Sequence, residues 1–192
     1  MMPLSYESLI RELNKIVETA CKQPANIYGY GIWTHHITHV VRFAKLLAKR
    51  LGADEEVVEI AAILHDYAGI KDQKLEKEHH IHGAQFAEKI LSSYGYPQEK
   101  IIQVKQCIER HRGSVRLEQN LPEVICVTSA DGMAHIDQFL SLLYMAYKER
   151  GMDIETGRVY IKEKLQRTWD KLCPEAQDIM QEKYRAVMKV LE

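Results

Sequence analysis

The side chains of this sequence that are best suited to chemistry centre on the adjacent pair His65-Asp66. The pair follows an apolar run at 60–64, so its imidazole and its carboxylate are expected to be largely buried. A buried, ionised carboxylate is costly unless it is paired or bound to a metal ion. Taken alone, such a pair is more often a core histidine next to a salt-bridged aspartate, so further residues must decide between the two interpretations.

Two other helical segments place residues of the same kind at core-facing positions. His39 stands among apolar residues of the preceding segment, and Asp131 follows the largely apolar run 127–130. Imidazole and carboxylate ligands suit zinc, iron, manganese and related divalent ions, and helix bundles build metal sites from inward side chains on facing helices. We therefore predict a metal site made of His39, His65, Asp66 and Asp131, with open positions for water and substrate.

This pattern resembles the metal signature of the HD superfamily of phosphohydrolases. Segment 39–43 (His-Val-Val-Arg-Phe) is similar to the family's His-x-x-Arg-Val opening, and segment 62–66 is similar to its step from an apolar run to His-Asp. The likeness covers about 34–137. It implies a compact, all-α helical bundle that hydrolyses a phosphoester through metal-activated water, with His65 and Asp66 as the catalytic pair.

A second metal ion is implied by the binuclear branch of the same superfamily, which adds two histidines between the His-Asp pair and the last aspartate. The candidates are His79, His80 and His82, followed by His111. In a similar stretch of the family the ligand stands four residues before a glycine, and this selects His79. His82 is the second candidate because it lies on nearly the same helix face. His111 also fits a helix-terminal histidine that the helix dipole favours. With two ions, Asp66 would be the natural bridge.

The resemblance implies one or two divalent ions of manganese, magnesium, iron, zinc, cobalt or nickel. It also calls for cations that hold a phosphate group, and the candidates by position are Arg42, Lys71, Arg112 and Arg116. Many relatives carry Ile-Gly-Lys directly after the His-Asp pair, whereas this chain has Tyr-Ala-Gly, so Lys71 is the lysine available there. Ordinary solvated charge is the alternative interpretation of all four.

Three further histidines lie next to these candidates. His35 and His36 are expected to face solvent or to support the ligands, rather than to bind a metal ion themselves. His135 lies one turn after Asp131, where it would contact a ligand or the substrate, or else cap or pack the helix.

Helical periodicity dominates the rest of the chain, and no alternating strand pattern is visible. Helices are expected at 4–21, 34–51, 57–64, 80–94, 98–112, 121–134, 137–150, 153–172 and 174–191. We predict a single domain over 1–192, a bundle of roughly eight to ten helices, in which a metal-binding core at about 34–137 is packed by helices of 138–192.

The composition limits the classes of partner that the chain is expected to bind. The 192 residues carry a formal net charge of −1, which argues against a broad nucleic-acid-binding face and leaves a small phosphorylated substrate, a nucleotide among them. No apolar run approaches the roughly 20 residues that span a bilayer, and 1–10 lacks a signal-peptide pattern. The four cysteines are far apart in the sequence, which suits a cytoplasmic protein with reduced thiols, and the C-terminal apolar stripes suit packing or a homodimer contact.

Two other functions use the same residues. A few binuclear members of the superfamily hold two irons and perform oxygen-dependent cleavage. Alternatively, a bound metal ion or nucleotide would serve a non-catalytic, structural or sensing role.

Overall fold

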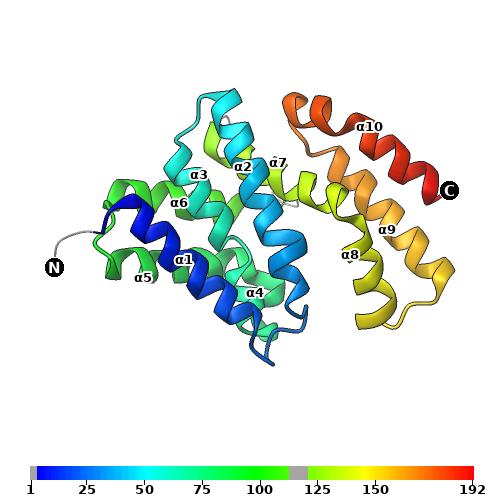
Figure 1. The fold of residues 1–192 in the computed structure, drawn as a ribbon, viewed down its shortest axis with the longest axis horizontal. Coiled ribbons are helices and arrows are strands. Elements are labelled where there is room, and N and C mark those ends of the chain that lie inside the picture. The colour runs from blue at the N-terminus through cyan, green and yellow to red at the C-terminus, as the bar shows by residue number, and fades with distance from the viewer. Residues whose placement is uncertain (1–3, 113–120) are drawn as a thin grey trace.

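A computed structural model describes residues 4–112 and 121–192 of the chain, and every regular element in these two ranges is helical (Figure 1). The expected all-α class is therefore confirmed. The elements are α1 (Tyr6–Cys21), η1 (Trp33–Ile37), α2 (Thr38–Leu51), α3 (Glu55–Leu64), α4 (Tyr67–Lys71), η2 (Gln73–Glu78), α5 (His79–Ser93), α6 (Gln98–Arg110), α7 (Pro122–Asp137), α8 (Phe139–Tyr144), η3 (Met145–Glu149), α9 (Ile154–Trp169) and α10 (Pro174–Val190).

Helices α1 to α6 form one side of the molecule in Figure 1, helices α8 to α10 form the other, and α7 runs between them. Helix α7 packs against α2, α3 and α6 on one side and against α9 and α10 on the other. Helix α3 lies in the core, since every residue from Val57 to Leu64 is buried. The side chain of Asp54 begins this helix by accepting hydrogen bonds from the backbone N–H groups of Glu56 and Val57, at 3.0 and 3.2 Å.

The chain turns sharply at the His65-Asp66 pair. Helix α3 ends at Leu64, Asp66 has φ −103° and ψ 3°, and α4 begins at Tyr67. Helix α5 approaches this corner closely at Gly83, where a Cβ atom would lie 3.1 Å from Ile108 Cγ2 and 3.4 Å from the His65 carbonyl oxygen. The glycine thus lets α5 and α6 meet next to the pair.

The C-terminal helices reach the other side of the same region through α7. A Cβ atom on Gly132 would lie 2.7 Å from Leu172 Cδ2 and 3.1 Å from Thr168 Cγ2, so α9 and the turn after it sit directly on α7. The N–H of Cys173 also donates to Ser129 Oγ at 3.1 Å. These contacts bring the end of α9 close to Asp131, the neighbour of Gly132 in the sequence.

The helix expected at 34–51 is divided in the structure. Its first part, η1, is a π-helical turn over Trp33–Ile37, and the regular helix α2 starts only at Thr38. A π-helical turn, with i→i+5 hydrogen bonds, is rare and occurs frequently at functional sites.

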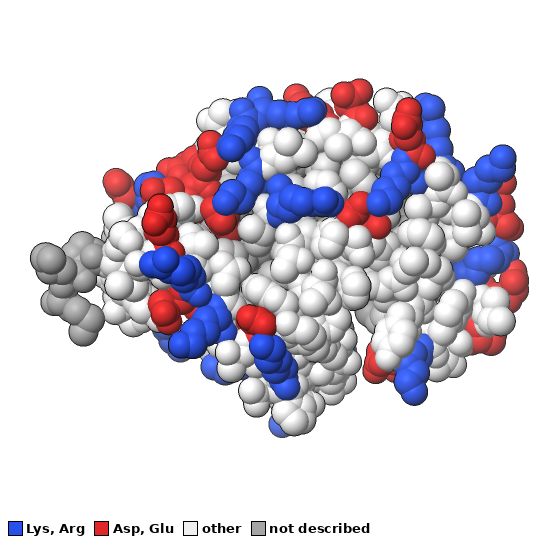
Figure 2. All heavy atoms as spheres, in the orientation of Figure 1, with Lys and Arg blue, Asp and Glu red and all other residues white. Residues whose placement is uncertain are grey.

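Acidic and basic side chains are intermixed over the face drawn in Figure 2, which agrees with the net charge of −1. Among the described helices there is none with both the length and the apolar character needed to cross a membrane.

Candidate metal centre

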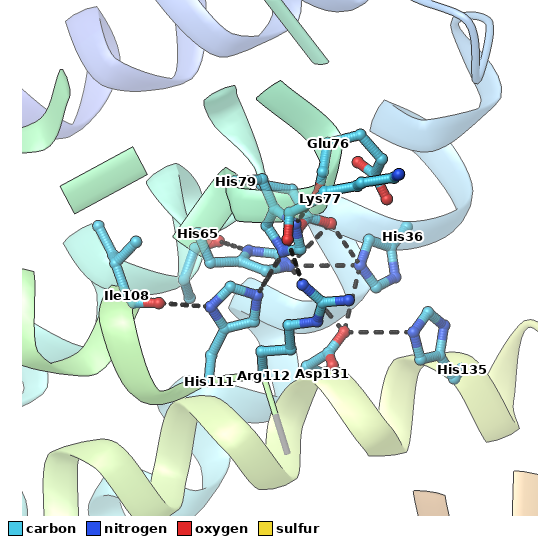
Figure 3. A network of polar contacts seen from close by, with 12 residues as sticks. His36, His65, Glu76, Lys77, His79, Ile108, His111, Arg112, Asp131 and His135 are labelled. Atoms are coloured by element: carbon cyan, nitrogen blue, oxygen red, sulfur yellow. Dashed lines mark hydrogen bonds and ion pairs between the residues drawn. The ribbon is translucent and has the colours of Figure 1, made fainter. Parts of the chain in front are cut away.

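Six imidazole and carboxylate side chains converge at one place in the fold, and Figure 3 shows most of them pointing toward one another. Helices and turns far apart in the sequence supply them: His36 from η1, His65 and Asp66 from the corner between α3 and α4, His79 from the start of α5, His111 from just beyond α6, and Asp131 from α7. His65 and His111 are buried, and the two carboxylates are partly buried.

The first group of donors consists of His36, His65 and Asp131 together with one oxygen of Asp66. His36 Nε2 lies 3.3 Å from Asp66 Oδ2 and 3.3 Å from Asp131 Oδ1. His65 Nε2 lies 3.3 Å from the same Asp66 oxygen and 4.0 Å from Asp131 Oδ1. Two neutral donors and two anionic donors thus surround one point, a combination that suits a divalent transition metal ion.

The second group uses the other oxygen of Asp66. Asp66 Oδ1 lies 3.3 Å from His79 Nε2 and 3.7 Å from His111 Nε2, and the two imidazole nitrogens are 3.1 Å apart. Asp66 therefore stands between the two groups and presents Oδ2 to one and Oδ1 to the other. This is the geometry of a carboxylate that can bridge two ions.

Backbone carbonyl groups orient three of the four imidazoles. The Nδ1 atom of each ring faces the carbonyl oxygen three residues earlier: His65 to Ala62 at 2.8 Å, His79 to Glu76 at 2.7 Å and His111 to Ile108 at 2.6 Å. A hydrogen bond to a carbonyl places the ring proton on Nδ1 in neutral imidazole. It leaves the Nε2 lone pair directed into the group, which is how metal-binding histidines are usually held.

The donor set fits a metal ion for a further reason. His79 Nε2 and His111 Nε2 face each other at 3.1 Å, and His65 Nε2 and His36 Nε2 face each other at 3.3 Å. Because His79 and His111 both donate through Nδ1, their neutral rings would present two lone pairs to each other, and that contact is repulsive. A cation between the rings turns the repulsion into two attractive contacts.

The electrostatics of the two carboxylates agree with this. Burial would raise the pKa of Asp66, but the charge of His65 and hydrogen bonds from His111 and His36 hold that pKa well below its usual value. Asp131 shows the same balance, because nearby histidines outweigh burial and lower its pKa. Burial would also lower the pKa of His65, yet the charge of Asp66 raises it. The negative field that holds a proton on an imidazole also attracts a metal cation.

The structure does not bring His39 into either group. Its Nδ1 atom lies 2.8 Å from Asp137 Oδ2, on a different carboxylate. His36, expected to face solvent or to play a supporting role, is only 8% exposed and occupies the predicted place of His39. We therefore correct the first ligand from His39 to His36. The physical reason is the position of His36 four residues before the buried Val40, which places its side chain on the inward face, whereas His39 lies against Asp137.

The contacts of Arg42 also lie outside the two donor groups. Its guanidinium donates to Asp137 Oδ2 at 3.1 Å and stacks over Phe43 at 4.4 Å from the ring centroid. Lys183 of α10 donates to the other oxygen of Asp137. The predicted phosphate contact of Arg42 is thus replaced, among the described residues, by a network that ties α2 and α10 to the end of α7.

This network leads to a pH prediction. Burial would raise the pKa of Asp137, but hydrogen bonds from Lys183, Gln138 and His39 lower it from 3.8 to about 2. The folded state therefore gains stability from the ionised carboxylate above pH 3.8, and that gain, about 2 kcal/mol at most, disappears as the pH falls toward 2. In urea titrations, Asp137→Asn should lower the free energy of unfolding at pH 7 and have almost no effect at pH 2. An equal loss at both pH values would show that the carboxylate charge is not what stabilises the fold.

Two other predicted cations have different positions. Lys71 lies over the rings of Phe86 and Tyr67, with its Nζ atom 4.6 and 5.7 Å from the centroids, so it is held by aromatic contacts. Arg112 directly follows His111 and donates to the Lys77 carbonyl oxygen, and Figure 3 shows its guanidinium beside the donor groups. Arg116 lies outside the described residues.

The structure places His80, His82 and His135 outside the two donor groups. His82 lies 3.8 Å from Glu78, and His80 Nδ1 is buried and has no hydrogen-bond partner among the described residues. His135 stacks on His36 with ring centroids 4.8 Å apart, and its Nε2 lies 3.5 Å from Asp131 Oδ1. Of the expected candidates in this stretch, only His79 reaches Asp66, whereas His135 contacts two donors of the first group from outside.

A family model for the HD domain matches residues 33–135, which include all six donors. The chain belongs to the HD domain family. Among curated relatives, Ribonuclease Y of Petrotoga mobilis is 33% identical over 107 residues, which are 56% of this chain and 19% of that protein. The chain thus spans about a fifth of the length of this relative.

Solved structures share the fold over nearly the whole chain. Bacillus subtilis YpgQ has a TM-score of 0.75 at 18% identity, covering 98% of this chain and 94% of that one. The same protein in complex with ADP has a TM-score of 0.67 at 17% identity, covering 97% and 94%. A predicted HD superfamily hydrolase from an uncultured Thermotogales bacterium has a TM-score of 0.61 at 22% identity, covering 94% and 88%. The likeness in fold to these solved structures thus extends over the C-terminal helices, beyond the residues that the family model matches.

Proposed function

We propose that this HD-family chain is a metal-dependent hydrolase of phosphoester bonds, acting on a small phosphorylated substrate of the nucleotide class. The observation that carries the proposal is the position of Asp66 between two groups of imidazole and carboxylate donors. A pair of divalent ions bridged by a carboxylate is a common arrangement for attack of water on a phosphoryl group.

The residues that would hold the first ion are His36, His65, Asp66 and Asp131. Asp66, His79 and His111 would hold the second. Bound there, a divalent ion of the manganese, magnesium, iron, zinc, cobalt or nickel type supplies a water of lowered pKa and neutralises charge on a phosphoryl oxygen.

The chain's own part in this chemistry is to fix positions. Asp66 keeps both groups in register because its two oxygens belong to one rigid carboxylate, and His65 next to it is held by the Ala62 carbonyl. Backbone carbonyl groups likewise keep the imidazoles of His79 and His111 from rotating away, so that little reorganisation is needed when substrate arrives. Arg112, at the exposed side of the second group, is placed to hold a phosphoryl oxygen.

The comparisons support the choice of substrate class. YpgQ, which shares the fold at 17% identity, has been solved with ADP bound. Ribonuclease Y, by its name, acts on RNA, whose backbone consists of phosphodiesters, and the matched part is one fifth of that protein. RNA and ADP share the nucleotide unit, and this supports a nucleotide phosphoester as the substrate class of this chain.

A substrate panel with added manganese, magnesium or nickel tests the proposal. The purified chain should release phosphate or a nucleotide from at least one phosphomonoester, phosphodiester or nucleoside di- or triphosphate. If metal ions bind and the whole panel stays intact, the proposed hydrolysis is wrong. Oxygen consumption by an iron-loaded sample in the same experiment would assign the site to the oxygenase alternative.

Replacing the two histidines of the second donor group should release the second ion and leave the first ion bound. The double substitution of glutamine for His79 and His111 is expected to lower the metal content from about two ions per chain to about one, because Asp66 alone cannot hold the second ion. Elemental analysis after dialysis measures this directly. His82→Gln is the matched control, since His82 lies on the same helix but pairs with Glu78 and should change nothing. An unchanged metal content in the double variant would place the second ion elsewhere.

A further inference from the structure

Two lysines stand near the first donor group and have no part in the proposed metal binding. Lys164 is on α9, and Lys171 follows shortly after this helix ends at Trp169. Sequence patterns alone assign this stretch to packing, because it contains no set of metal ligands. Its position beside α7 gives it a second role.

The packing of α9 against α7 sets the direction of both lysines. Thr168 contacts the position of Gly132, the residue after Asp131, and lies one turn after Lys164 and one turn before Lys171. The N–H of Lys171 donates to the Thr168 carbonyl oxygen at 3.2 Å, so the helical path continues to this residue. Residues three and four apart share a helix face, and the two lysines therefore flank the contact with Gly132 on the side of α7 that carries Asp131 and His135.

The charges confirm this closeness. Burial lowers the pKa of Lys171, and among its charged neighbours Asp131 opposes this effect while Lys164, Arg167 and Arg112 add to it. Lys164, Arg167 and Arg112 thus lie close enough to Lys171 for their charges to act on it, which makes a group of four cations.

Two of the four cations have partners among the described residues. Arg167 pairs with Glu163 at 3.6 Å, and Arg112 donates to the Lys77 carbonyl oxygen. Within the described residues, neither Lys164 nor Lys171 forms an ion pair with a carboxylate. Like charges held close together are unfavourable unless an anion joins them.

We infer that Lys164 and Lys171 bind an anionic group of the substrate that is not itself under attack, such as the next phosphate of a nucleoside di- or triphosphate. The inference rests on the proposed function and deepens it, because it makes the site selective for substrates with two or more linked phosphates. A phosphoryl group at the metal-binding residues would have its neighbouring phosphate within reach of the α9 side. A monoester with an uncharged leaving group would leave the lysines unused.

Methylenediphosphonate, which resembles a diphosphate and is not hydrolysed, is the probe, and methylphosphonate is the single-anion reference. Calorimetric titration of the metal-loaded protein should show that Lys164→Gln and Lys171→Gln each weaken methylenediphosphonate binding about tenfold, with a larger loss in the double variant. Methylphosphonate binding should change less than twofold. Lys171→Arg, which keeps the charge, should restore most of the affinity, and Lys162→Gln, a change two residues from Lys164 on another face of α9, should have no effect.

Three results would overturn the inference: the wild-type protein fails to bind methylenediphosphonate, the double variant binds it as tightly as wild type, or Lys162→Gln weakens binding as much as the two lysine variants do. The proposed function is decided separately. If the wild-type protein hydrolyses a monoester and the lysine variants bind the probe normally, the hydrolase assignment stands and the lysine site is wrong. If no phosphoester is hydrolysed while the lysines prove necessary for binding, the lysine site stands and the hydrolase assignment is wrong.

Discussion

Asp66→Asn should empty both proposed metal positions and lower phosphoester hydrolysis by about a thousandfold or more, equivalent to a barrier increase of ~4 kcal/mol. The asparagine keeps the size of the side chain but loses its charge, and it offers a single carbonyl oxygen where the carboxylate offers two. Both donor groups depend on that residue, since Oδ2 faces His36 and His65 while Oδ1 faces His79 and His111. Elemental analysis and a hydrolysis assay on the same sample measure the two losses together.

Asp178→Asn on α10 is the matched control, because it removes an equally negative side chain from an exposed position. It should keep both ions and full activity. Thermal unfolding of both variants shows whether the fold survives, and the loss of metal ions and activity is assigned to Asp66 only if the Asp66→Asn protein is folded. Two ions retained by a folded Asp66→Asn protein would contradict the bridging role of this residue.

Substitutions of His36 and His39 should have different effects on metal binding and on stability. His36→Gln should reduce the metal content by about one ion per chain and abolish most hydrolysis, because His36 Nε2 lies 3.3 Å from both carboxylates of the first group. His39→Gln should keep the metal ions and instead destabilise the fold by about 1–2 kcal/mol, since it removes a hydrogen bond to the largely buried Asp137 carboxylate.

Each of the two histidine variants serves as the control for the other, since they differ by three positions and remove the same imidazole. Metal content, activity and the midpoint of thermal unfolding should be measured for both. The prediction fails if His39→Gln loses an ion while His36→Gln keeps it, and the family-like order of ligands starting at His39 would then be correct.

The case of His36 shows how far the sequence could predict the site. The resemblance selected His65, Asp66, Asp131, His79 and His111, and the structure brings all five together. For the first ligand, the resemblance selected His39 where the structure has His36. The reason is that the residues from His39 onward match the family's opening. The apolar stripe contained a signal for the alternative, since His36 lies four residues before the buried Val40 and eight before the buried Ala44.

Other features could not be predicted from local pattern. The all-α class followed from helical periodicity, and so did most helices, because burial of one face repeats along each of them. The π-helical turn at 33–37 has no comparable signal, since it depends on how η1 packs against α7. The placement of Lys164 and Lys171 beside Asp131 depends on the close contact at Gly132, which joins residues more than 30 positions apart. Arg42 has the right neighbours in the sequence, yet Asp137 from the end of α7 engages it.

We expect Asp66 to join two metal positions in this fold. Crystals grown with manganese, with anomalous diffraction recorded on both sides of the manganese absorption edge, test it most directly. We predict two anomalous peaks per chain, one among His36, His65, Asp66 and Asp131, the other among Asp66, His79 and His111. A single peak with His39 as a ligand, or no peak at Asp66 in crystals that contain manganese elsewhere, would contradict the claim.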